Sequence, residues 1–335
     1  LSRRPFAFVP QVEHYFPGRA IESARQTLVR CIERAEGMGL VVGPSGTGKT
    51  LLLQTLAQRF RSSFNVAFLA NSHLPSRRSL LQAILFELGL PYRGLDEGEL
   101  RLSLVDHLSD SATQGMVLLI DEAHLLPLRL MEEIRMIANL ARHGQPQVRI
   151  VLAGGAALEE RLATPKLASF AQRLSARCYL ESLDLSETVA YVRAQLSSCG
   201  GNANEMFSEA ALDTIFRATD GVPRLVNQLC DHILVLAFAG GQTWIDVAGV
   251  EEAWADLQQL PSPWNESTRF DDSGHGSGGV VEFGVLDDAN EADEPGPSTV
   301  RFNAPAQEFS ETDFQPLAKR QPEVELVVTA SPDPF

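Results

Sequence analysis

Two short stretches carry the residue types that hold and cleave a phosphate anhydride. The first is GPSGTGKT, residues 43–50, which comprises Gly43, Pro44, Ser45, Gly46, Thr47, Gly48, Lys49 and Thr50. Its glycines let the backbone wrap an anion with N–H groups, and a helix beginning at Lys49 would point its N-terminal dipole at the phosphates. In such a loop the lysine reaches the β- and γ-phosphates and the final hydroxyl binds Mg²⁺. The stretch predicts a site for ATP and Mg²⁺.

The second stretch is VLLIDEAHLLP, in which Asp121 and Glu122 follow a continuous apolar run of strand length. An aspartate at the carboxyl end of a strand beside a phosphate loop is where Mg²⁺ needs a second anchor. Glu122 stands one residue further along and can orient and polarise a water in line with the γ-phosphate. With Thr50 and Asp121 as metal ligands and Glu122 as the catalytic base, the pattern predicts an ATPase.

His124 completes the letters DEAH, which raises the alternative of a helicase. A helicase of that kind has two similar ATPase lobes, whereas one is visible here, and no Q-x-x-G-R-x-G-R motif follows. The triplet Ser111-Ala112-Thr113 precedes Asp121, although that class carries its SAT triplet after the acidic motif. We therefore set the helicase aside and interpret His124 as local scaffolding.

The elements that position these residues alternate between strands and helices. Apolar runs predict strands at 38–42, 66–70, 116–121, 148–155 and 178–183. Apolar residues at helical spacing predict helices at 18–36, 49–60, 80–88, 100–108 and from Pro127 to about residue 142. This alternation predicts an α/β fold with a parallel sheet covered on both faces.

The predicted strands stop before residue 186, and the composition changes again after residue 260. Helices are expected at 186–198, 208–219, 223–239 and 246–257. Residues 261–335 hold 15 acidic and 4 basic residues, so this segment carries −11 of the net charge of −15. We expect a nucleotide-binding core at 1–183, an α-helical lid at 184–260 and a disordered acidic tail at 261–335.

Several further stretches make the chain resemble AAA+ ATPases of the ExeA/GspA type (general secretion pathway protein A, MSHA-biogenesis-like) and their transposition relatives. They are HYFPGRAIESA, LLIDEAHLLPLRLMEEIRMIANL, VRIVLAGGAALEERLATPKLASFAQRLSARCYLESLDLSETVAYVRAQL and DGVPRLVNQLCDHILVLA. The resemblance covers roughly residues 6–257. It implies a P-loop NTPase (AAA+) fold, with a three-layer core and a small helical lid. It also implies ATP hydrolysis coupled to remodelling or assembly of a protein partner, as in secretion and pilus assembly.

The resemblance adds two arginines to the expected site. Arg173, in SFAQRLSAR, matches the family's arginine finger, which acts on ATP held by a neighbouring subunit and so implies a ring or a dimer. Arg177 is a competing finger. Arg224, in GVPRL, matches the lid arginine called sensor 2, which reaches back to bound ATP and couples lid position to nucleotide state.

One position departs from the family pattern. Where relatives carry a polar side chain after the fourth strand, this chain has Gly155, in LAGGAAL. A glycine cannot position the attacking water or contact the γ-phosphate through a side chain. Either Asn139 or another group substitutes, or hydrolysis is slow and the protein works as a nucleotide-dependent binding switch.

Composition bears on location and partners. No run of about 18 apolar residues is present, so we expect no transmembrane segment. The four cysteines form no C-x-x-C pair, which favours reduced thiols and a cytoplasmic protein. The arginine pairs outside the tail are Arg3-Arg4, Arg59 with Arg61, and Arg77-Arg78. With a net charge of only −4 on residues 1–260, nucleic-acid binding is not favoured, and a DNA-binding transposition-type regulator remains the alternative.

Overall fold

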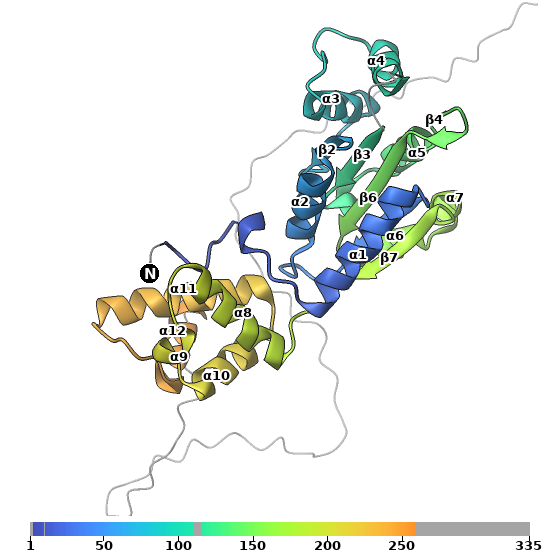
Figure 1. Ribbon diagram of the computed structural model, residues 1–335. Coiled ribbons are helices and arrows are strands. Elements are labelled where there is room, and N and C mark those ends of the chain that lie inside the picture. The colour runs from blue at the N-terminus through green and yellow to red at the C-terminus, as the bar shows by residue number, and fades with distance from the viewer. Residues whose placement is uncertain (1–2, 10, 110–114, 259–335) are drawn as a thin grey trace, which may run out of the picture. The chain divides into compact units, whose positions relative to one another are not determined.

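A computed structural model describes residues 3–9, 11–109 and 115–258. The expected acidic tail lies outside the described residues. The α/β core is built on a five-stranded parallel sheet with the strand order β2-β3-β6-β1-β7 (Figure 1). The strands are β1 (Met38–Val42), β2 (Asn65–Leu69), β3 (Met116–Ile120), β6 (Val148–Gly154) and β7 (Leu174–Tyr179).

Helices cover both faces of the sheet, as the sequence predicts. One apolar cluster joins the sheet to α1 (Arg19–Arg34) and α2 (Lys49–Phe60). The other joins it to α3 (Arg77–Glu87), α4 (Glu97–Ser109), α5 (Leu128–Ile137) and α6 (Ala156–Leu162). The described core is therefore a three-layer α/β structure, and the predicted fold class is confirmed.

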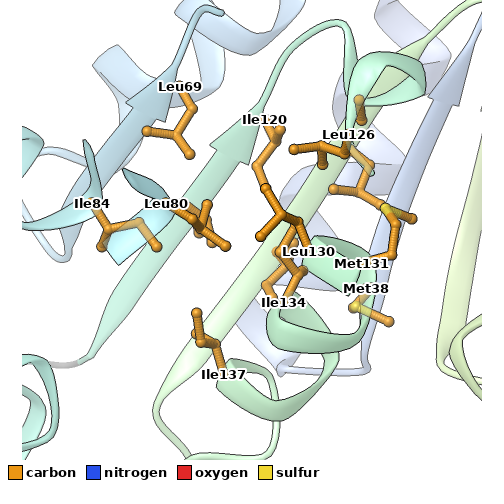
Figure 2. Close-up of a cluster of buried hydrophobic side chains, with 14 of the residues drawn as sticks. Met38, Leu69, Leu80, Ile84, Ile120, Leu126, Leu130, Met131, Ile134 and Ile137 are labelled. Carbon is orange, nitrogen blue, oxygen red and sulfur yellow. The ribbon is translucent and has the colours of Figure 1, made fainter. Parts of the chain in front are cut away.

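Side-chain alternation along the strands explains why both faces are apolar. Leu118 of β3 belongs to the cluster with α3 and α5, while its neighbour Leu119 belongs to the cluster with α1 and α2. Successive strand residues point to opposite faces, so a strand buried on both sides must be apolar throughout. Figure 2 shows the cluster with α3 and α5, in which Leu80 and Ile84 lie on one side of Ile120 and Leu130 lies on the other side.

Two predicted elements differ most from the structure in their bounds. The helix expected to reach residue 142 ends at Ile137, because β4 (Ala141–Arg142) turns back onto β5 (Gln145–Pro146) through His143 and Gly144, both at positive φ. The strand expected at 178–183 lies at 174–179 instead. Its register with β1 begins at Leu174, and beyond it Leu183 donates its N–H to Gly221 in the lid.

The segment expected to be a lid, for which we keep that name, is a bundle of helices around its own apolar cluster. Its helices are α8 (Leu185–Ser198), α9 (Ala203–Met206), α10 (Glu209–Thr219), α11 (Pro223–Ala239) and α12 (Val247–Gln258). Asp184 begins α8 with a capping box, since its carboxylate accepts from the Glu187 N–H while the Glu187 side chain accepts from the Asp184 N–H. A cap of this kind stabilises a helix by about 1 kcal/mol.

The segment before α1 is tied to the lid. Phe6 is buried in the lid cluster, and the Ala7 carbonyl accepts a hydrogen bond from Asn227. The His14 carbonyl accepts from the Gln195 amide 3.0 Å away. The sequence does not predict these contacts, because the segment shows no periodic pattern.

None of the helices in the described ranges is long and apolar enough to cross a membrane.

Candidate functional site

The loop between β1 and α2 needs its glycines for three separate reasons. Gly46 has φ +87° and Gly48 has φ +97°, a region that side chains with a Cβ rarely adopt. A Cβ on Gly46 would also lie 2.9 Å from the Arg224 Cβ, and one on Gly43 would lie 2.5 Å from the Leu180 carbonyl oxygen. The loop therefore combines an αL backbone with close approach of two other segments.

Lys49 begins α2 and turns its side chain back into the loop. Its ammonium donates to the Gly43 carbonyl at 2.9 Å and to the Pro44 carbonyl at 2.7 Å. Only 7% of the residue is exposed, and this burial lowers the pKa of Lys49, against the opposing attraction of Glu122 and Asp121. The cation is held inside the loop by two carbonyl oxygens, which phosphate oxygens can replace as its partners.

Asp121 follows β3 and is 3% exposed. Its Oδ2 accepts a hydrogen bond from the Thr50 hydroxyl at 2.5 Å, and its Oδ1 accepts from the Glu122 N–H at 2.9 Å. Its backbone is fixed as well, since its N–H donates to Leu69 and its carbonyl accepts from the buried Ser72 hydroxyl. The sequence-predicted metal ligands Thr50 and Asp121 therefore lie side by side. No motif in the sequence indicated Ser72.

Glu122 has a backbone conformation unusual for its residue type, with φ 49° and ψ 36°. Such a left-handed conformation costs about 1–3 kcal/mol and is concentrated at functional sites. Its side chain is 44% exposed, and one carboxylate oxygen lies 3.2 Å from His124 Nδ1. That pair is close enough for ionic attraction but is not aligned as a hydrogen bond. The carboxylate therefore has an open side on which a water can sit.

Gly155 follows β6 and precedes α6. Its φ of −79° is accessible to any residue, and a Cβ placed there meets no heavy atom within 4 Å. The preceding carbonyl, of Gly154, accepts a hydrogen bond from the Gly43 N–H at 3.3 Å. The position thus borders the phosphate loop and has room for the polar side chain that the family pattern puts there.

Arg224 lies in the first turn of α11 and contacts the loop twice. Its N–H lies 3.3 Å from the Gly46 carbonyl, and its Nη1 donates to the Ser45 hydroxyl at 3.2 Å. The approach depends on Gly221, which has φ +65°; a Cβ there would lie 1.9 Å from the Leu183 carbonyl. Arg224 therefore contacts the loop through both its backbone and its side chain.

Arg173 is not brought to this loop. It precedes β7, and its carbonyl accepts from the N–H of Met38, the first residue of β1, whereas the loop follows the last residue of β1. The five residues of β1 separate the two edges by about 16 Å. The guanidinium donates to the Asn139 amide oxygen, so Asn139 also lies at the far edge. Asn139 therefore does not replace the polar side chain missing at Gly155.

Arg177, the competing finger, and the arginines considered for nucleic-acid binding lie on different elements. Arg177 is exposed in the middle of the edge strand β7, opposite Leu40. Three of the arginines considered for a nucleic-acid patch pair with carboxylates on different elements. These pairs are Arg4 with Asp231, Arg59 with Glu33, and Arg77 with Glu133. Their charges are thus partly neutralised.

A cavity of about 460 Å³ opens beside the loop. Lys49, Thr50 and Glu122 line it on the core side, while Tyr191 and Arg224 line it on the lid side. Burial raises the pKa of Tyr191 to about 12, and its hydroxyl donates to the Asn227 amide oxygen at 2.7 Å. Its volume lies within the range of ordinary small-molecule sites.

The sequence of this chain is similar to those of known proteins. Residues 32–162 match the family model described as AAA domain. The chain is 35% identical over 246 residues to general secretion pathway protein A of Aeromonas hydrophila. That match covers 72% of this chain and 44% of that protein, so the chain spans less than half of the relative's length. The resemblance to AAA+ ATPases of the ExeA/GspA type is confirmed.

Solved structures show the same fold at low sequence identity. The ORC2 protein of Aeropyrum pernix, in ADPNP–ADP complexes, has a TM-score of 0.58 and 17% identity, covering 76% of this chain and 71% of that chain. Cdc6p of Pyrobaculum aerophilum has a TM-score of 0.61 and 20% identity, covering 76% of this chain and 70% of that chain. Both confirm the P-loop NTPase fold of the AAA type and nothing narrower.

Replacing Gly46 by alanine should test the loop geometry. Its positive φ and the 2.9 Å approach to Arg224 both oppose a Cβ, so we expect a loss of about 1–2 kcal/mol of stability and at least tenfold weaker ATP binding. Gly144→Ala is the matched control, because φ is +76° there but no atom lies within 4 Å. Chemical denaturation and calorimetric titration with ATP measure both effects. Equal ATP affinity in the two variants would contradict the assigned role.

Proposed function

We propose that this chain, which carries an AAA domain, binds ATP with Mg²⁺ and hydrolyses the ATP in an assembly of identical subunits. The observation that carries the proposal is the 2.5 Å hydrogen bond between the Thr50 hydroxyl and the Asp121 carboxylate. Mg²⁺ prefers hard oxygen ligands and is commonly held by one or two carboxylates together with phosphates. Both groups lie at the edge of the sheet where the Lys49 cation is held.

The residues present fit a nucleoside triphosphate and its metal. The backbone N–H groups of residues 43–50 would bind the phosphates, and Lys49 would exchange its two loop carbonyls for β- and γ-phosphate oxygens. Mg²⁺, when bound, supplies positive charge that offsets the charge developing on the phosphates. Thr50 and Asp121 would hold that metal, Asp121 through a water.

Glu122 would act as the general base. It is adjacent to Asp121, its carboxylate is partly exposed, and it lines the same cavity as Lys49. A carboxylate there accepts a proton from water as the water attacks the γ-phosphate. The absence of a side chain at Gly155 leaves one fewer group to orient that water. This favours slow turnover, so a nucleotide-dependent binding switch is the second candidate function.

Two arginines would act on the bound nucleotide in different ways. Arg224 would sense it from the lid, since it already contacts Gly46 and Ser45 of the loop. Arg173 cannot serve its own loop, because the length of β1 separates them, and it is exposed at the opposite edge. It would therefore complete the site of a neighbouring subunit in a ring or dimer, where its cation stabilises the transition state.

The relative supports a proposal for the class of partner. General secretion pathway protein A is named for secretion, and we propose that this chain acts in the cytoplasm on a protein partner of a secretion or pilus apparatus. ATP turnover would drive remodelling or assembly of that partner. A DNA-binding transposition-type regulator is the alternative, but the pairing of Arg4, Arg59 and Arg77 with carboxylates weighs against it.

Glu122→Gln tests the proposed base. ATP affinity should stay within about threefold, while turnover falls by roughly 10²–10⁴, because glutamine is isosteric but cannot accept the proton. Glu160→Gln, at an exposed position on α6, is the control and should keep full turnover. Phosphate release under saturating ATP measures the rate. Unchanged turnover in Glu122→Gln would remove this residue from the role.

Gly155→Asn tests the missing polar group. The amide should help to orient the attacking water and raise turnover about tenfold or more, since single positioned polar groups are worth that much in active sites. Gly155→Ala adds a Cβ without an amide and should leave turnover unchanged, because the space is open and φ is −79°. Equal rates for the asparagine and alanine variants would mean that another group already orients the water.

Mixing two inactive variants tests Arg173 in trans. Arg173→Ala and Lys49→Ala should each lose about 10³ in turnover. An equimolar mixture should regain activity, because a mixed contact offers an intact Lys49 site to an intact Arg173 of the neighbour. Arg177→Ala is the control and should remain active. A mixture as inactive as its components, or a loss in Arg177→Ala equal to that in Arg173→Ala, would overturn the assignment.

A further inference from the structure

A short turn follows the two acidic residues. The 3₁₀ segment η2 (Ala123–Leu125) is closed by the Leu125 N–H, which donates to the Glu122 carbonyl at 2.9 Å. The next N–H, of Leu126, donates to the Ala123 carbonyl at 3.2 Å. Ala123 and Leu126 are fully buried. Glu122 is therefore the first residue of a turn whose buried side chains anchor it in the core.

Arg161 holds this turn from α6. Its Nη1 donates to the His124 carbonyl and its Nη2 donates to the Leu126 carbonyl, the latter at 2.5 Å. One planar guanidinium thus engages two carbonyls in a fork, across 37 and 35 residues of sequence. Charge-assisted bonds of this kind are stronger and more directional than neutral ones. The carbonyls cannot shift independently while the fork is in place.

The end of β6 also lies against this turn. A Cβ on Gly154 would lie 2.9 Å from a Leu158 methyl and 3.5 Å from the backbone nitrogen of His124. The glycine lets α6 fold close to the turn, and α6 carries Arg161. The Gly154 carbonyl also accepts from Gly43, the first residue of the phosphate loop. The turn that begins with Glu122 and the loop that begins with Gly43 are thus tied to the same strand end.

We propose that Arg161 is a positioning residue for Glu122. By fixing the His124 and Leu126 carbonyls, Arg161 keeps Glu122 at φ 49° and directs its carboxylate toward the cavity that Lys49 also lines. This inference rests on the proposed hydrolytic function. It adds that α6 sets the geometry of the base, and α6 leads along the chain to Arg173.

The first test compares turnover with ATP affinity in the full chain. Arg161→Ala should lower turnover about 10- to 100-fold, because a displacement of about 1 Å costs this much, while ATP affinity stays within about threefold. Arg161→Lys should not restore turnover, since one ammonium cannot engage both carbonyls in a fork. Arg217→Ala, exposed on α10, is the control and should match the wild type. Equal losses in affinity and turnover would reduce Arg161 to a structural role and overturn the proposal.

A double variant separates positioning from other roles. Adding Arg161→Ala to Glu122→Gln should cause no further loss of turnover, because a residue that acts through Glu122 has nothing left to position. A multiplied loss would overturn the proposal. Should Arg161→Ala fail to fold, Arg161→Lys keeps a charged donor without the fork and should show the same separation of turnover from affinity.

Amide hydrogen exchange gives a readout that needs no turnover. The Leu125 and Leu126 amides should lose protection in Arg161→Ala and keep it in Arg217→Ala. A wild-type protein that binds ATP without hydrolysing it would contradict the proposed function alone. Unchanged protection of these two amides in Arg161→Ala would overturn the positioning role whether or not the wild type is active.

Discussion

The hydrogen bond from Thr50 to Asp121 joins two segments that leave the sheet on either side of a third strand. Thr50 follows β1 and Asp121 follows β3, while β6 lies between them. The two side chains lie 2.5 Å apart although the end of β6, with Gly154 and Gly155, stands between the two strands. At the same strand end, the Gly154 carbonyl accepts a hydrogen bond from the Gly43 N–H, and Gly154 lies against the turn after Glu122. The strand order and the Gly154 carbonyl thus hold the phosphate loop and the turn after Glu122 at one edge of the sheet.

The phosphate loop is also the meeting point of parts that are distant in sequence. Gly46 accepts from the backbone of Arg224, and Gly221 allows the segment before α11 to pass close to Leu183. The lid in turn holds the first residues of the chain, because Phe6 belongs to its apolar cluster. A change at the loop on nucleotide binding therefore has direct contacts through which to reach the lid.

Local signals predicted the core of the fold well. The bounds of β1 and α2 were predicted correctly, because an apolar run, a glycine loop and a helix start are readable within a few residues. The last strand is misplaced because β7 is an edge strand in which exposed and buried residues alternate, so it contains no continuous apolar run. The contact of Ser72 with Asp121 spans 49 residues and that of Arg161 with His124 spans 37, so no short pattern could reveal them.

The central claim is that the site hydrolyses ATP and is completed by a neighbouring subunit. Steady-state ATP hydrolysis across a concentration series, with and without duplex DNA, tests it most directly. We predict a rate per subunit that rises with protein concentration, saturates as subunits associate and does not respond to DNA. A rate per subunit independent of concentration would contradict completion of the site in trans. Tight ATP binding without turnover at any concentration would contradict hydrolysis and leave a nucleotide-dependent switch.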